Sequence, residues 1–209
     1  MHLVLVGDSI FDNAPYTRGE PEVIVQVRDL LPKNWRATLL ALDGSTTRTV
    51  LNQLGRMPAD ATHLVLSVGG NDALWRADIV TSPVRRMSEA LSELAELGEE
   101  FEQNYRRVVF AFHELKLPLI LSTIYDGYFP DREYQRLAST ALTHFNDVIL
   151  RVGFELGLTV IDLRFICSQP DDYANPIEPS SVGGAKIARA IVNALLPADC
   201  KDIARVITS

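Results

Sequence analysis

The sequence predicts an α/β fold in which helices cover both faces of a parallel sheet. Short apolar runs recur along the chain, these runs are unbroken rather than alternating, and helix-length segments separate them. Unbroken apolar strands are typical of a parallel sheet that is buried on both faces. Strands that alternate with helices imply right-handed crossovers, so we expect an open, doubly wound, three-layer α/β/α sandwich with flavodoxin-like topology.

Five apolar runs are the predicted strands of this parallel sheet. Each is short, rich in leucine or β-branched residues, and bounded by turn residues, as strands usually are. The runs are residues 1–6, 35–42, 63–68, 117–123 and 158–163. We therefore predict a five-stranded parallel sheet.

Helix-length segments fill the intervals between and after these runs. They are residues 22–31, 46–54, 84–115, 131–156 and 181–196, and we expect a break in the third near Gly98. The glycine is the reason for that expectation, because it weakens a helix interior. Residues 197–209, which follow the last helix, are interpreted as a short surface appendage.

Composition narrows the classes of protein to consider. With 209 residues, 47% of them hydrophobic, the chain is large enough for one well-buried core, so we expect a single domain over residues 1–209. Its 27 acidic and 20 basic residues give a net charge of −7, which opposes binding to nucleic acids and anionic membranes. No sequence feature predicts an oligomeric state.

The ends of the chain and its cysteines bear on location and cofactors. The N-terminal apolar run is too short for a signal peptide or a membrane span and lacks a basic flank. Cys167 and Cys200 form neither a metal-ligand spacing nor a disulfide framework. We expect a cytoplasmic protein with no metal and no other cofactor.

The loops at the carboxyl ends of the strands are where an open parallel sheet binds its ligands. The first such loop places Ser9 in the turn G-D-S-I. The second contains Gly44, whose N–H can approach a ligand closely, and the third contains Asn71, whose side-chain amide is a donor. Together with the N–H of Ser9, these groups could form an oxyanion hole of three donors.

These residues carry a resemblance to a known family. G-D-S-I, the glycine of D-G-S and G-G-N-D occur here in the order and spacing of the first three motif blocks of the SGNH (GDSL) hydrolases. The resemblance implies a flavodoxin-like sandwich that hydrolyses small-molecule acyl esters. It also implies that Ser9 is the nucleophile and that Gly44 and Asn71 complete the oxyanion hole.

The last motif block departs from the family pattern. The family has an aspartate, two further residues and then a histidine, whereas this chain has Asn175 and Glu178 at those positions. The four histidines of the chain do not compensate. His2 and His63 open strands, roughly 15–20 Å from the carboxyl edge of the sheet. His113 and His144 lie in helices, at positions that we also expect to be distant from Ser9.

Glu178 is therefore the expected base for Ser9. Burial can raise the pKa of a carboxylate by a few units, and carboxylates serve as general bases in enzymes. We expect Asn175 to donate a hydrogen bond to the carboxylate where the family aspartate accepts one from histidine.

Two alternatives remain open at this point. Glu178 could instead place a negative charge near the N-terminus of the following helix, an interaction worth about 0.3–1 kcal/mol, with Ser180 or Ser181 as the cap. The chain could also be a catalytically inactive relative that binds a ligand in the same cleft. Flavin-binding and phosphoacceptor functions fit less well, since Gly69 stands where a phosphoacceptor aspartate would be required.

Four further residues of the same loops are candidates for substrate binding. They are Asp8, Trp75, Tyr125 and Tyr128. Asp8 could tune the serine, and the aromatic residues could wall a pocket for an acyl or aromatic group. Their alternatives are a turn-forming role for Asp8 and ordinary packing for the aromatic rings.

Overall fold

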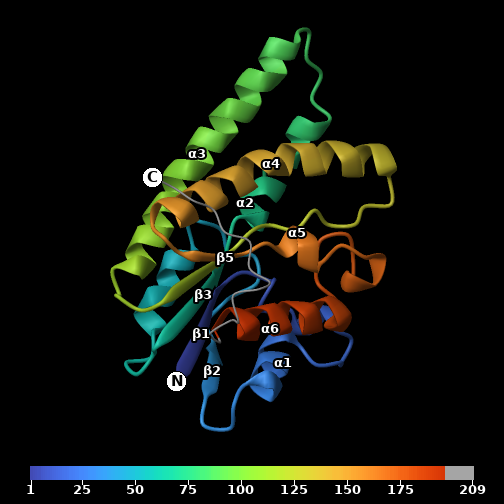
Figure 1. The fold of residues 1–209 in the computed structure, drawn as a ribbon. Helices are drawn as coiled ribbons and strands as arrows, with labels where there is room; N and C mark the ends of the chain where they lie inside the picture. Colours follow the sequence, from blue (N-terminus) through green and yellow to red (C-terminus); the bar gives the residue numbers. More distant parts are fainter. Residues whose placement is uncertain (196–209) are drawn as a thin grey trace, which may run out of the picture.

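A computed structural model, which describes residues 1–195, contains the predicted parallel sheet between two layers of helices (Figure 1). The strands are β1 (His2–Gly7), β2 (Arg36–Leu39), β3 (His63–Ser67), β4 (Leu119–Ser122) and β5 (Thr159–Ile161). All neighbours pair in parallel, in the order β2-β1-β3-β4-β5. This is the flavodoxin-like strand order, so the predicted fold class is confirmed.

Burial of the central strand explains its unbroken apolar sequence. Every residue of β1 is buried, and Leu3 pairs with Ala37 of β2 on one side and His63 of β3 on the other. Leu3 and Leu5 point into one apolar core, while Val4 and Val6 point into the other. Neither face of the strand meets water, as the sequence pattern predicted.

Different helices cover the two faces. Helices α1 (Val23–Leu30) and α6 (Ser181–Leu195) pack against each other in the core that contains Leu3 and Leu5. The opposite core receives η2 (Val50–Arg56), α3 (Met87–His113) and α4 (Arg132–Glu155). The shorter helical segments are η1 (Ala14–Tyr16), α2 (Gly70–Leu74), η3 (Ala77–Val80), α5 (Leu163–Ile166) and η4 (Pro170–Asp172).

Two predicted helices differ from the observed ones. Residues 46–54 do not form one regular helix, because the side chains of Thr46 and Thr49 bond locally and only the 3-10 helix η2 follows. Helix α3 runs through Gly98 without the expected break. A Cβ at Gly98 would be 4.0 Å from the Cβ of His144, so the glycine lies in the contact between α3 and α4. The predicted appendage after Pro197 lies outside the described residues.

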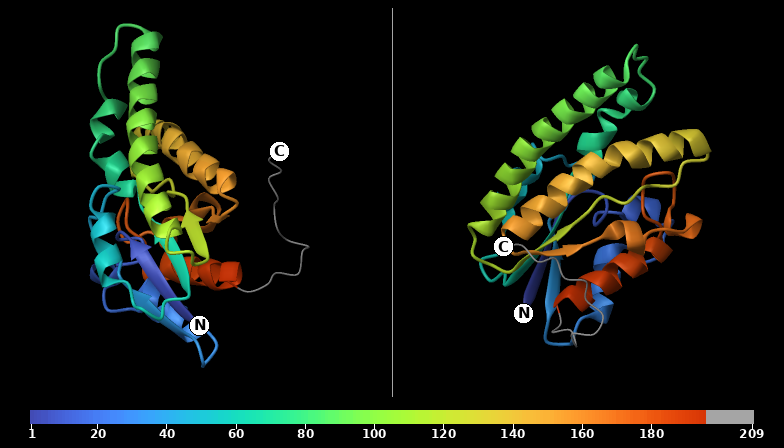
Figure 2. Two further views of the ribbon diagram at one scale, coloured as in Figure 1. Left: turned by 90° about the vertical axis from the view of Figure 1, so that its left-hand side faces the viewer. Right: turned by 45° about the horizontal axis from the view of Figure 1, so that its top comes forward.

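Helices α3 and α4 are close together over their C-terminal halves and diverge toward their N-terminal ends (Figures 1 and 2). Arg106 of α3 pairs with Glu155 of α4 at 2.7 Å, and Arg151 of α4 pairs with Glu102 of α3 at 2.9 Å, in the converging part. The segment α2–η3 occupies the diverging part. Of the helices in residues 1–195, none is long and apolar enough to cross a membrane.

Candidate active site

The turn after β1 presents Ser9 at the carboxyl edge of the sheet. Gly7 has a φ of +136°, and a Cβ there would lie 1.8 Å from the carbonyl oxygen of Ser67, so the position requires glycine. The side chain of Gln53 accepts from the Gly7 N–H at 2.8 Å and donates to its carbonyl at 2.7 Å. The Asp8 N–H donates to Ser67, which leaves Ser9 at the tip of a rigid turn.

Two of the three donor groups predicted for the oxyanion hole are unengaged, and the third keeps a free hydrogen. Within residues 1–195 the backbone N–H groups of Ser9 and Gly44 donate no hydrogen bond. Gly44 has a φ of +76°, which favours glycine. Asn71, in the first turn of α2, donates from Nδ2 to the Ser45 carbonyl at 2.9 Å. An amide carries two hydrogens, so this bond orients Asn71 and leaves one hydrogen for a ligand.

Two polar side chains that sequence reasoning missed brace these loops. Asp72 accepts from the Thr47 N–H at 3.0 Å and from its hydroxyl at 2.5 Å, which ties α2 to the loop of Gly44. Gln53 donates also to the Ser45 hydroxyl at 3.3 Å. Asp72 belongs to the G-G-N-D motif and could have been suspected, whereas nothing in the sequence around Gln53 indicates its role.

Hydrogen bonds within its own loop and one from Tyr125, in the loop after β4, hold the backbone around Glu178 in place. The side-chain oxygen of Asn175 accepts from the N–H groups of Ile177 and Glu178, both at 2.9 Å. The Ala174 N–H donates to the Glu178 carbonyl, and the Tyr125 hydroxyl donates to the Ile177 carbonyl at 2.6 Å. Asn175 therefore fixes the backbone of the loop, and the expected donation from its amide to the carboxylate is not formed.

The N-terminus of α6 has a cap of its own. The Ser180 hydroxyl oxygen accepts from the N–H groups of Val182 and Gly183 at 3.1 and 3.2 Å. These bonds satisfy donors of the first turn that have no partner within the helix. The carboxylate of Glu178 makes no such bond, so the helix is capped without it.

The Glu178 carboxylate is buried beside the Ser9 hydroxyl. Burial raises the pKa of Glu178 to about 7, a nearby hydrogen bond from Ser9 opposes that rise, and the charge of Asp43 adds to it. Ser9 is thus a neighbour of the carboxylate, but within residues 1–195 no hydrogen bond of standard length and angle joins the two side chains, and Oε2 of Glu178 has no hydrogen-bond partner. Catalytic hydrogen bonds are often long or poorly aligned before substrate binds.

A second buried carboxyl group, that of Asp8, lies in the same place. Burial raises its pKa to about 8, a hydrogen bond from the Ile10 N–H opposes this, and the charge of Glu178 adds to it. Burial therefore disfavours ionisation of both carboxyl groups, and an ionised Glu178 further disfavours a charge on Asp8. At neutral pH the Asp8 carboxyl is mostly protonated.

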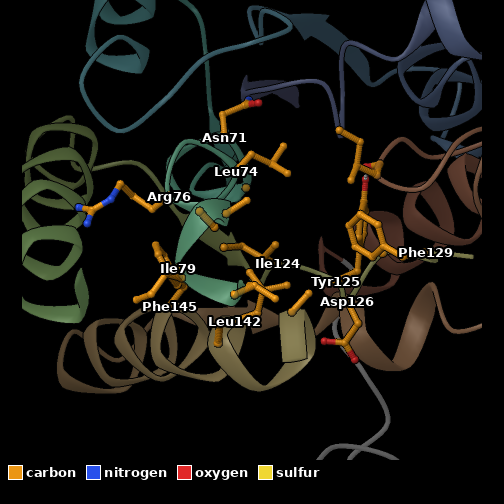
Figure 3. A pocket seen from close by; sticks show the side chains of 18 of the residues that line it. Asn71, Leu74, Arg76, Ile79, Ile124, Tyr125, Asp126, Phe129, Leu142 and Phe145 are labelled. Carbon is orange, nitrogen blue, oxygen red and sulfur yellow. Dashed lines mark hydrogen bonds between the residues drawn. The ribbon is translucent and has the colours of Figure 1, made fainter. Parts of the chain in front are cut away.

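Ser9 and Glu178 both line one cavity of about 860 Å³, counting the part that is open to solvent (Figure 3). Asp8, Asn71 and Tyr125 line it as well. The structure therefore brings the loops after β1, β3, β4 and β5 together around a single hollow, in which no histidine of residues 1–195 takes part.

Two of the candidate substrate-binding residues lie outside this cavity. Trp75 follows the last residue of α2 and is 69% exposed. The ring of Tyr128 is half exposed and stacks on Tyr173, with 6.4 Å between ring centroids. Sequence reasoning placed both on the correct loops but could not determine the direction of their side chains. Conversely, it missed the apolar lining residues Leu74, Ile79, Leu142 and Phe145.

Solved structures share this architecture over nearly the whole chain. An extracellular lipase from Streptomyces rimosus is 16% identical, with a TM-score of 0.70, and the match covers 93% of this chain and 99% of that one. The lipase Lip_vut3 from a goat rumen metagenome is 19% identical, with a TM-score of 0.72 and coverage of 93% and 97%. The acetyl xylan esterase AlAXEase is 15% identical, with a TM-score of 0.67 and coverage of 94% and 100%.

These structural matches establish the fold, and a sequence comparison establishes the family. No curated protein sequence matches the chain. The model of the GDSL-like lipase/acylhydrolase family matches residues 5–183, which contain Ser9, Gly44, Asn71 and Glu178. Because this match extends over most of the sequence, the chain belongs to the GDSL-like lipase/acylhydrolase family.

Proposed function

We propose that this protein hydrolyses acyl esters through an acyl-enzyme formed on Ser9, with Glu178 as the general base. Family membership supports ester hydrolysis in general. The single observation that supports the unusual base is the buried Glu178 carboxylate next to the Ser9 hydroxyl, with a pKa raised to about 7. A base with a pKa near the working pH combines the ionised form with useful basicity.

The free-energy cost of burying the Glu178 carboxylate is larger than the stabilisation it could give as a charge near the N-terminus of α6. A rise of the pKa from 4.5 to about 7 corresponds to a penalty of about 3 kcal/mol on the ionised form. A charge near a helix N-terminus returns only about 0.3–1 kcal/mol. Ser180 already caps α6, so a residue retained for the helix alone would not have to be buried at the cavity.

The proposed reaction has two halves that use the same residues. The Ser9 oxygen attacks the ester carbonyl carbon while Glu178 takes the hydroxyl proton. The oxyanion is stabilised by the N–H groups of Ser9 and Gly44 and the free amide hydrogen of Asn71. Protonated Glu178 then gives its proton to the leaving alcohol oxygen as the carbon–oxygen bond breaks, which leaves the acyl group on Ser9. In the second half, Glu178 takes a proton from a water molecule that attacks the acyl carbon. The proton returns to the Ser9 oxygen as the carboxylic acid leaves.

Asp8 has a supporting role in this scheme. Its carboxyl group is mostly neutral at pH 7, because its pKa is about 8, so Glu178 carries the main negative charge beside Ser9. A second charge there would repel the developing oxyanion. Asp8 thus contributes as a neutral neighbour of the serine rather than as a second base.

Hydrolysis of p-nitrophenyl esters by the wild type and by the Ser9→Ala and Glu178→Gln variants tests the proposal. We expect turnover that Ser9→Ala abolishes and that Glu178→Gln lowers by at least a hundredfold, in keeping with the usual effect of a general base of about 10²–10⁴. The exposed Glu99→Gln on α3 is the matched control. Absence of Ser9-dependent turnover between pH 4 and pH 9 would overturn the proposal.

A second candidate, a catalytically inactive protein that binds a ligand in the same cavity, is favoured by one observation. Asn175 holds the backbone and not the carboxylate, so no residue of 1–195 orients Glu178 as the family aspartate orients its histidine. The double variant Asn175→Asp, Glu178→His separates the candidates. Activity that appears only in this variant supports the inactive protein, whereas activity of the wild type that Glu178→Gln removes supports the enzyme.

A further inference from the structure

The cavity has a polar end and a long apolar part. Asp8, Ser9, Asn71 and Glu178 form the polar end. Away from them the walls are mainly aliphatic or aromatic and come from α2, η3, α3, α4 and the loop after β4; they include Leu74, Ile79, Leu97, Ile124, Leu142 and Phe145 (Figure 3). We call this apolar part the slot. It lies where α3 and α4 diverge and α2–η3 fills the interval between them.

The charged groups of the residues beside the slot point away from its apolar interior. Figure 3 shows the guanidinium of Arg76 and the carboxylate of Asp126 directed away from the labelled apolar side chains. Arg76 lies 3.9 Å from Glu100 on α3. A polar acyl group in the slot would therefore lose its hydrogen bonds to water without gaining equivalent partners, which is costly. An aliphatic group would lose nothing and gain burial.

One face of α4 sets the length and width of the slot. Tyr134, Ala138, Ala141 and Phe145 all line it, at helical spacings of three or four residues. From Tyr134 to Phe145 the helix rises roughly 16 Å, about the length of an extended acyl chain of roughly twelve carbons. The two alanines leave room beside the helix. Phe145 packs on Phe101 of α3, with ring centroids 4.8 Å apart, and adds an aromatic wall to the slot.

We infer that the slot takes the unbranched, medium-length acyl chain of an ester, whose carbonyl then lies at Ser9 and the oxyanion donors. This inference rests on the proposed function, because it places the acyl part of that substrate and not the alcohol part. It assigns the chain to esters of medium-length acyl groups rather than to acetate esters.

The acyl-chain profile of kcat/KM is the first test. In a series of p-nitrophenyl esters from acetate to palmitate, each methylene that becomes buried raises kcat/KM by up to about fourfold, from about 0.8 kcal/mol per group. We expect a maximum between the octanoate and the dodecanoate, at least a hundredfold above the acetate. A maximum at the acetate, in an enzyme that is active through Ser9, would overturn the inference and leave the proposed function intact.

A variant that fills the slot is the second test. In Ala141→Trp the indole would occupy the space of the acyl chain, so the ratio of kcat/KM for the decanoate to that for the acetate should fall at least tenfold. Ala95→Trp, which makes the same change on an exposed face of α3 outside the slot, should keep the wild-type ratio. An unchanged ratio in a folded Ala141→Trp protein contradicts the inference. Ala141→Phe replaces it if the larger residue prevents folding.

Binding without catalysis separates the inference from the proposed function. Saturation-transfer NMR with 1-octanol and the Ser9→Ala protein reports occupancy of the slot with no chemical step. We expect a signal that Ala141→Trp or Ala141→Phe removes and Ala95→Trp retains. If the wild type shows no esterase activity and this binding result is nevertheless obtained, the slot is supported while the proposed function fails. No octanol signal, or a signal that the filling variants leave unchanged, overturns the inference.

Discussion

Replacing Glu178 with glutamine is expected to stabilise the protein at alkaline pH, although it removes the proposed base. Glutamine resembles the protonated carboxyl group in shape and carries no charge. The pKa of Glu178 is raised from 4.5 to about 7, mainly by burial, so the folded state disfavours the ionised form. The wild type therefore loses stability as the pH rises from about 4.5 to about 7, and the variant does not.

The magnitude follows from these two pKa values. At pH 8 the folded protein has incurred nearly the whole penalty, so Glu178→Gln should be more stable than the wild type by about 3 kcal/mol. At pH 5 the difference should be about 1 kcal/mol or less, because the folded carboxyl group is still protonated. For a chain of this size the difference at pH 8 corresponds to a rise in Tm of roughly 6–12 °C.

Thermal unfolding of the wild type and the variant at pH 5 and pH 8, followed by circular dichroism, measures this difference. The exposed Glu99→Gln on α3 should change Tm by less than about 2 °C at either pH, as is usual for surface substitutions. A Glu178→Gln variant that is no more stabilised at pH 8 than at pH 5 would refute the reasoning, because the carboxylate could not then be buried as the structure has it.

Further predictions concern the oxyanion hole and the residues that support the turn of Ser9. Asn71→Ala should lower kcat for an ester by about 10²–10³, whereas the exposed Asn52→Ala should not, as steady-state kinetics can show. Gln53→Leu leaves the N–H and carbonyl of Gly7 without partners, so the free energy of unfolding should fall by about 2–5 kcal/mol in chemical denaturation. The exposed Gln103→Leu is the control, and a loss below about 1 kcal/mol for Gln53→Leu would contradict the bracing role. Gly7→Ala should prevent stable folding or lower Tm sharply, since its Cβ would overlap the Ser67 carbonyl; a normal melting curve would argue against this turn geometry.

The sheet and the turn that holds Ser9 could be predicted because local sequence determines them. Unbroken apolar runs such as the one that forms β1 report burial on both faces directly. The G-D-S-I turn needs glycine at position 7 for steric reasons that any sequence with this turn must satisfy. Ser9, Asn71 and Glu178 could be assigned to one edge because the carboxyl ends of parallel strands lie together.

The remaining features depend on packing between distant segments. The slot exists because α3 and α4 diverge and α2–η3 lies between them, an arrangement that no single segment encodes. Trp75 and Tyr128 were placed on the correct loops, but a loop position does not fix the direction of a side chain. Asn175 was expected to serve the carboxylate, yet a short loop with two prolines leaves its own N–H groups to be satisfied, and the Asn175 oxygen satisfies two of them.

The most direct test of the central claim is the pH dependence of covalent labelling of Ser9 by a fluorophosphonate, followed by intact-mass spectrometry. Glu178 must be ionised to take the serine proton, so the labelling rate should rise through an apparent pKa near 7. Peptide mapping should place the adduct on Ser9, Ser9→Ala should remain unlabelled, and Glu178→Gln should react slowly without that pH dependence. Labelling that is absent, or equally fast and equally pH-dependent in Glu178→Gln, would contradict a Ser9–Glu178 catalytic pair.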